Sequence, residues 1–149
     1  MPGKNFVLGG GGFHHLAIKV RDFDKSVKMY ADAFGFTPKV CWGTKTPQED
    51  SRAVMLDTGD GNFLEVFAGG PAVPHVPAGP MTCNAAIMHV AFRTTRIDEV
   101  ITRARAAGFT VAVEPKDVAP NGDISARIAF VHGPDGEVIE FFQGEFYKQ

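Results

Sequence analysis

The sequence has few cysteines, little net charge and no long hydrophobic run, and each of these absences excludes a class of protein. Its 149 residues include only Cys41 and Cys83, too few for a disulfide framework or a zinc ribbon. The formal net charge of −2 argues against binding to nucleic acid or to an anionic membrane. No apolar run approaches the roughly 18 residues that span a bilayer, and the segment MPGKNFVLGGGG is not a secretory signal. We therefore expect a cytoplasmic protein with reduced thiols.

The composition that remains is that of an ordinary folded domain. Hydrophobic residues make up 44% of the chain and charged residues 21%, which excludes wholesale disorder. A chain of this length buries about 68–70% of its unfolded surface, so it can form a core without help from metals or disulfides.

The chain repeats itself at an offset of 73 to 75 residues. The segment FHHLAIKVRDFDKSV, beginning at Phe13, aligns with IMHVAFRTTRIDEVI, beginning at Ile87. Further on, AVMLDTGDGNFLEVFAG aligns without a gap with IAFVHGPDGEVIEFFQG. The matched pairs include His15 with His89, Asp24 with Asp98, Asp60 with Asp135, Gly61 with Gly136, and Glu65 with Glu140. A third block, GFT, recurs at 35–37 and 108–110, and three blocks in one order predict a duplicated structural unit.

Each copy predicts a βαβββ module, so the expected fold class is α+β, with two tandem modules forming a cup-shaped mixed sheet. The apolar periodicity predicts strands over 14–20 and 89–94, helices over 22–34 and 96–107, and further strands over 36–42 and 109–114. Asp-Gly pairs predict tight hairpin turns, and Thr95 with Asp98 resembles a capping box. We divide the chain into a flexible segment 1–12 and a single domain 13–149, built of module one (13–68), a connector (69–86) rich in Pro and Gly, and module two (87–144).

Alternation along the strands isolates four polar residues. His15, Ala17 and Lys19 share one face of their strand, and the opposite face is apolar. Glu65 and Glu140 each lie between large apolar residues on their own face. A carboxylate there is costly unless it is paired, hydrogen-bonded or bound to a metal.

Two imidazoles and two carboxylates suit Zn²⁺, Ni²⁺, Co²⁺, Mn²⁺ or Fe²⁺ better than Ca²⁺ or Mg²⁺. The sequence therefore predicts one divalent ion held by His15, Glu65, His89 and Glu140. We interpret the other histidines as structural: His14 on the core side of its strand, and His75 and His132 in loops or a turn. Trp42 is expected in the core, and Glu49 and Asp50 in a solvated loop.

These segments carry a resemblance to a known family. HHLAIKVRDFDKSVKMYADAFGF, GDGNFLEVFAGG, MHVAF and GPDGEVIEFF resemble the vicinal oxygen chelate superfamily, which includes glyoxalase I, methylmalonyl-CoA epimerase, extradiol dioxygenases and fosfomycin- or bleomycin-resistance proteins. The resemblance implies paired βαβββ modules around a divalent metal, a homodimer, and the same four ligands. Whether the cup forms within one chain or between two stays open.

The bacterial type of glyoxalase I resembles the chain most closely, because it has the complete His, Glu, His, Glu set. Extradiol enzymes and fosfomycin-type transferases lack a fourth ligand at the place of Glu65, the epimerase has Gln there, and bleomycin-binding members have no metal. The resemblance to the glutathione pocket is incomplete, since Lys19, Gly69 and Ala85 replace its Arg, Asn and Arg.

The resemblance implies proton transfer through a metal-bound enediolate on a small α-hydroxycarbonyl or hemithioacetal, with Glu140 as the base and Glu65 as its symmetric partner. The alternatives are an epimerase-like enzyme, whose second acid would lie near Glu49, an extradiol-type dioxygenase, and a non-catalytic drug-binding protein. We expect a small, anionic substrate. The residues predicted to bind it are Lys19, Arg93, Phe63, Phe67 and Phe142.

Overall fold

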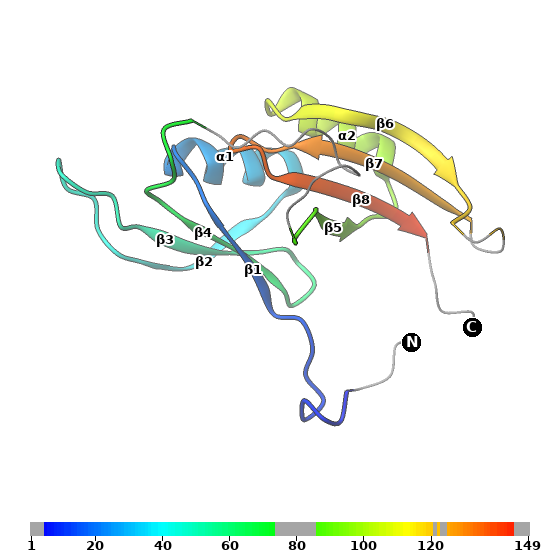
Figure 1. Cartoon of the computed structure of the whole chain (residues 1–149), viewed down its shortest axis with the longest axis horizontal. Helices are drawn as coiled ribbons and strands as arrows, with labels where there is room; N and C mark the ends of the chain where they lie inside the picture. The colour runs from blue at the N-terminus through cyan, green and yellow to red at the C-terminus, as the bar shows by residue number, and fades with distance from the viewer. Residues whose placement is uncertain (1–4, 74–85, 121, 123–124, 145–149) are drawn as a thin grey trace.

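Two successive βαβββ units make up the fold, as the sequence predicted (Figure 1). The computed structural model describes residues 5–73, 86–120, 122 and 125–144. The first unit contains β1 (His15–Lys19), α1 (Phe23–Phe34), β2 (Thr37–Trp42), β3 (Ala53–Asp57) and β4 (Phe63–Phe67). The second contains β5 (Val90–Arg93), α2 (Ile97–Ala106), β6 (Thr110–Val118), β7 (Ala126–His132) and β8 (Val138–Gly144). Neither α1 nor α2 is long and apolar enough to cross a membrane.

Each unit forms its own four-stranded mixed sheet. The strand orders are β1-β4-β3-β2 and β5-β8-β7-β6, and in each sheet the first strand pairs parallel to the last. The two registers are equivalent: Ala17 lies opposite Glu65, and Ala91 lies opposite Glu140. The sequence repeat is therefore a structural repeat, and it leaves β1 and β5 at the sheet edges.

Helix α1 begins and ends where its sequence signals predict. The side chain of Asp22 accepts a hydrogen bond from the Lys25 backbone N–H at 3.1 Å, which caps the first turn. Gly35 follows the helix with φ +72°, a left-handed conformation that glycine adopts without strain.

Helix α2 begins differently from the prediction. The capping box expected at Thr95 is wrong: the N-cap residue is Arg96, and its side chain makes no capping hydrogen bond. The side chain of Gln143, on β8, instead accepts a hydrogen bond from the Ile97 backbone N–H at 3.1 Å. A residue distant in sequence thus accepts the hydrogen bond from a first-turn N–H that the N-cap side chain usually accepts.

Three further expectations need correction. Strand β6 runs on to Val118, beyond the predicted end at 114, because it follows β7 across two register shifts. The Asp-Gly turns lie within connections 58–62 and 133–137, longer than two-residue hairpins. Trp42 is 41% exposed rather than in the core, because every residue of β2 is exposed.

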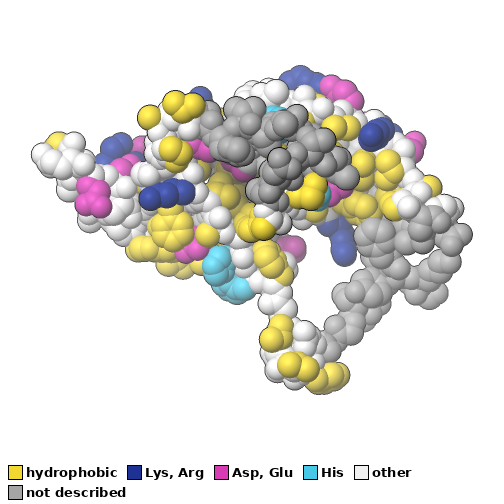
Figure 2. Space-filling view, in the orientation of Figure 1, with side chains coloured by type: hydrophobic (Ala, Val, Ile, Leu, Met, Phe, Trp, Pro, Cys, Tyr) yellow, Lys and Arg dark blue, Asp and Glu magenta, His cyan; other side chains and the backbone are white. Residues whose placement is uncertain are grey.

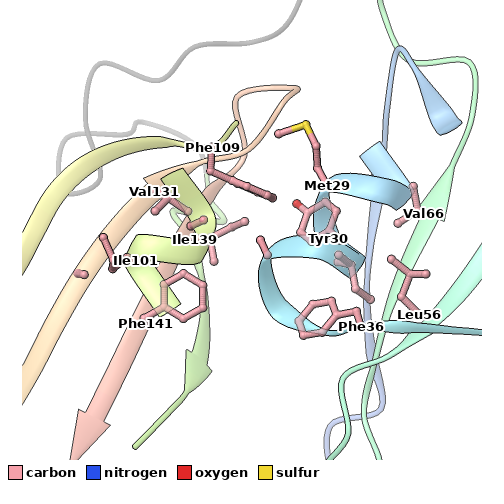
Figure 3. Close-up of a cluster of buried hydrophobic side chains, with 14 of the residues drawn as sticks. Met29, Tyr30, Phe36, Leu56, Val66, Ile101, Phe109, Val131, Ile139 and Phe141 are labelled. Atoms are coloured by element: carbon pink, nitrogen blue, oxygen red, sulfur yellow. The ribbon is translucent and has the colours of Figure 1, made fainter. Parts of the chain in front are cut away.

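The two units share one hydrophobic core, in which α1 lies between its own sheet and the second unit (Figure 3). Tyr30 of α1 packs edge-on against Phe109 with 5.4 Å between ring centroids, and Phe34 packs against Phe141 at 5.0 Å. On the other side, α1 packs on the apolar face of the first sheet. Helices α1 and α2 also contact each other. Each sheet therefore buries one face and leaves the other away from the core.

Hydrogen bonds from Tyr30 and Arg21 join the first unit to the second. The Tyr30 hydroxyl donates to Glu137 Oε1 at 2.5 Å, and the Asp135 backbone N–H donates to Glu137 Oε2 at 2.9 Å. The Arg21 backbone N–H in turn donates to Asp135 Oδ1 at 2.8 Å. Burial raises the pKa of Glu137, although the bond from Tyr30 opposes this shift.

Replacing Glu137 by Gln should change the free energy of unfolding, relative to wild type, in a direction that favours the variant more as the pH rises. The folded protein holds the pKa of Glu137 above its ordinary value of 4.5. The stability that this group contributes is therefore complete below the unfolded pKa and is lost as the pH rises through the folded pKa. An amide fills the same space without ionising.

Urea unfolding between about pH 4.5 and pH 8 checks this prediction. The free energy of unfolding of Glu137→Gln, relative to wild type, should increase with pH. Glu99→Gln changes an exposed carboxylate and should give a difference that does not vary with pH. A pH-independent difference for Glu137→Gln as well would contradict the prediction.

Candidate functional site

The first predicted His–Glu pair is in contact on the outer face of the first sheet. Parallel pairing of β1 with β4 places Ala17 opposite Glu65, and His15 lies two residues earlier on the same face. The Nε2 atom of His15 lies 3.4 Å from Glu65 Oε2. The carboxylate is nearly buried and the imidazole half-exposed, so the pair faces outward.

The second pair repeats this arrangement more tightly. His89 immediately precedes β5, and its Nε2 atom lies 3.1 Å from Glu140 Oε2 on β8. Burial raises the pKa of the Glu140 carboxyl, and the neighbouring His89 partly opposes the shift. Phe130 packs edge-on against the His89 ring at 5.5 Å. The Nδ1 atom of His89 is buried and has no hydrogen-bond partner among the described residues.

The two pairs do not meet within one chain. Although all four residues are described, the described part of the chain contains no group of three or more His, Cys, Asp or Glu side chains that could hold one ion. The reason is architectural, because each pair lies on a separate sheet, on the face opposite the side chains that form the core. One chain thus presents two half-sites, which we call half-site one (His15 and Glu65) and half-site two (His89 and Glu140).

The predicted substrate-binding residues divide between two hollows. Lys19 and Phe67 line a cavity of about 660 Å³ beside half-site one, together with Glu49 from the loop before β3. Phe63 and Arg93 line a larger, open cleft of about 1200 Å³ between the two units. Phe142 lies opposite Arg93 in the β5–β8 register, at the margin of half-site two.

The loop that contributes Glu49 is held by ion pairs. Arg52 donates to both oxygens of Asp50, at 2.9 and 2.8 Å, and this hydrogen bonding lowers the pKa of Asp50 to about 2. Arg52 also donates to Asp24 of α1. Both Glu49 and Asp50 border the cavity, but Asp50 is engaged in these ion pairs.

The interpretation of His14 as a core-side residue is wrong. Its side chain is exposed, and its Nδ1 atom lies 2.9 Å from the Nδ1 atom of His15. The ring also packs on Phe63, which lies opposite His15 on the outer face, with 5.2 Å between centroids. The adjacent histidines in the sequence were the available signal. His132 ends β7 rather than lying in a turn, and His75 lies outside the described residues, as does Cys83.

Large hydrophobic side chains are exposed around the outer faces. Phe13 and Ile87 occupy equivalent repeat positions, two residues before His15 and His89, and are 68% and 69% exposed. Val40 and Trp42 extend the exposed apolar surface across β2. Figure 2 shows hydrophobic side chains gathered over the strands of the first sheet.

Known proteins are similar to this chain in sequence and in fold. The uncharacterized protein YwbC of Bacillus subtilis (strain 168) is 27% identical over 129 residues, which are 87% of this chain and 94% of YwbC. Among solved structures, a V278E mutant of glyoxalase I from Zea mays has a TM-score of 0.66 and 21% identity; the match covers 87% of this chain but only 43% of the maize chain. FosX, a genomically encoded fosfomycin resistance protein from Listeria monocytogenes, has a TM-score of 0.66 and 16% identity, over 91% of this chain and 95% of FosX.

At these identities the solved structures establish the fold alone. The family is established separately, because the model of the Glyoxalase/Bleomycin resistance protein/Dioxygenase superfamily matches residues 12–141, which include both half-sites. The chain belongs to the Glyoxalase/Bleomycin resistance protein/Dioxygenase superfamily.

Proposed function

We propose that this protein is a divalent-metal-dependent enzyme of the glyoxalase I type, which transfers a proton on a small, anionic α-hydroxycarbonyl or hemithioacetal substrate. The observation that carries the proposal is the repeated contact between an imidazole and a carboxylate, at 3.4 Å in half-site one and 3.1 Å in half-site two. Duplication of a surface pair with the same donor atoms on the same face has no structural explanation in the described core.

The residues present fit a metal ion. Two donors that bind one ion at about 2.1 Å lie about 3 Å apart when they are adjacent ligands, close to the separations in both half-sites. Imidazole and carboxylate donors suit Zn²⁺, Ni²⁺, Co²⁺, Mn²⁺ or Fe²⁺. The Nδ1 atom of His89 is buried and lacks a hydrogen-bond partner among the described residues. The Nε2 atom lies beside Glu140 and would be the one that binds the metal. Each half-site alone offers two protein donors, fewer than the three or four of ordinary zinc sites.

A second copy of the chain supplies the missing donors. A dimer with two-fold symmetry that sets half-site one of one chain against half-site two of the other makes two equivalent four-ligand sites. Such pairing also covers Phe13 and Ile87, which are otherwise exposed beside the half-sites. We therefore propose a homodimer in which His15 and Glu65 join His89 and Glu140 of the second copy.

In the proposed reaction, a divalent ion held by these four residues would polarise the substrate oxygens and acidify the proton on the neighbouring carbon. Glu140, whose carboxylate lies 3.1 Å from His89 Nε2, takes that proton as the base. Glu65 is its equivalent on the other side of the site. Lys19 and Arg93, at the two hollows, attract the anionic part of the substrate.

Removal of a ligand should remove the metal. Protein purified without a tag should contain about one divalent ion per chain, since a dimer has two sites and two chains. His15→Ala and His89→Ala should each weaken metal binding by more than about 100-fold, because loss of a residue that only supports a ligand costs about 10- to 100-fold. Glu114→Ala, which changes an exposed carboxylate on β6, is the matched control. A full metal content in both histidine variants would exclude these ligands.

Deuterium exchange tests the reaction class. Hemithioacetals and acyl-CoA thioesters are incubated in D₂O with protein loaded with Ni²⁺, Co²⁺ or Zn²⁺, and exchange next to the carbonyl is followed by NMR. Wild type should exchange a hemithioacetal, and Glu140→Gln at saturating metal should be slower by about 10²- to 10⁴-fold, the usual contribution of a general base. Exchange on acyl-CoA thioesters alone would indicate the epimerase-like reaction instead.

The other activities predict different outcomes in this experiment. A drug-binding protein would bind a ligand without exchange. A dioxygenase would consume oxygen, and only with Fe²⁺ or Mn²⁺. Either result, without exchange on any substrate, would refute the glyoxalase-type reaction.

A further inference from the structure

His14 and His15 form a hydrogen bond between two imidazoles at the start of β1. Their Nδ1 atoms are 2.9 Å apart, and the rings meet edge-on with an interplanar angle of 86°. A neutral imidazole carries one N–H and one acceptor nitrogen, so one of these Nδ1 atoms donates and the other accepts. The contact therefore allows two arrangements, which differ in whether His14 or His15 holds its proton on Nδ1.

The role of His15 fixes the direction of this bond. If Nε2 of His15 is to bind a metal, its lone pair has to be free and the proton has to lie on Nδ1. We infer that His14 is a positioning residue, whose Nδ1 accepts the Nδ1–H of His15 and so holds His15 in the tautomer and orientation that bind metal. This inference rests on the proposed function, but the hydrogen bond itself can be measured without metal.

The surroundings of His14 hold its ring in place for this task. The Phe63 backbone N–H donates to the His14 carbonyl oxygen at 2.9 Å, which ties the residue to β4. The Phe63 ring packs on the His14 ring with 5.2 Å between centroids. Because Phe63 also lies opposite His15 in the parallel register, one aromatic residue aligns both members of the pair. A metal-binding imidazole usually donates its second N–H to a fixed acceptor, and His14 is such an acceptor.

The repeat provides an internal comparison. The residue equivalent to His14 in the second unit is Met88, whose thioether is at most a weak acceptor. The Nδ1 atom of His89 accordingly has no partner in the described part of the chain. The two half-sites therefore differ: half-site one has its imidazole oriented in advance, and half-site two has a tighter contact between His and Glu.

Substitutions of His14 test the inference, with Met88→Leu as the matched control. His14→Leu should lower the affinity for Zn²⁺, measured by competition with a chelating dye, by about 10- to 100-fold. His14→Asn should recover most of the loss, because its amide oxygen can accept the same hydrogen bond. Met88→Leu should leave the affinity unchanged. Equal affinities for wild type and His14→Leu would overturn the inference.

Nitrogen NMR of the histidine rings separates this inference from the proposed function. In metal-free wild type, a scalar coupling between the Nδ1 nuclei of His14 and His15 should report the hydrogen bond, and it should be absent in His14→Asn and His14→Leu. In the Zn²⁺-loaded protein, the ring ¹⁵N shifts should place the His15 proton on Nδ1. Failure of wild type to bind Zn²⁺ while the coupling is present would refute the metal site alone. Zn²⁺ binding with the coupling absent, or with the His15 proton on Nε2, would refute the role of His14 alone.

Discussion

The packing of α1 between its own sheet and the second unit determines which surfaces remain available for chemistry. Helices α1 and α2 pack against each other and bury the inner faces of the two sheets in one core, and the bond from buried Tyr30 to Glu137 joins the two units. The outer faces then carry the polar residues of each repeat. Since the half-sites lie on these faces, the same packing that stabilises the chain separates His15 and Glu65 from His89 and Glu140. In the proposed function, a second copy of the chain therefore has to complete the four-ligand site.

Features that depend on strand alternation were predictable from the sequence. His15 and Glu65 share the outer face of two neighbouring strands, with Glu65 opposite Ala17, and the repeat places His89 and Glu140 in the same relation. The separation of the two pairs was not predictable, because it depends on how the two sheets dock. That docking is set by side chains of α1, which are distant in sequence from most of the residues they contact.

The errors also have physical causes. The expected cap at Thr95 was replaced by Gln143, a long-range partner that no local motif reveals. The interpretation of His14 followed strict alternation, but His14 precedes β1 and does not keep the alternation of the strand. Its ring turns to the outer face, where Phe63 and His15 provide contacts. For a polar residue next to a candidate ligand, a hydrogen bond to that ligand should thus be considered before a place in the core.

The duplicated unit gives each half-site the same donors but different support. Half-site one has His14 behind its imidazole, whereas half-site two has a more buried imidazole and a carboxyl whose pKa is raised by burial. The proposed division of roles follows: half-site one orients a ligand, and half-site two supplies the base.

Complementation between two inactive variants tests most directly whether one metal site is shared by two chains. One chain carries His15→Ala and Glu65→Ala, the other carries His89→Ala and Glu140→Ala, and the two are co-expressed with different tags. Shared sites predict that each mixed dimer regains one intact site, so that an equal mixture binds about a quarter of the wild-type metal while either variant alone binds almost none. If the mixed dimers form and still bind no metal, the four residues do not assemble across two chains, and the shared site is contradicted.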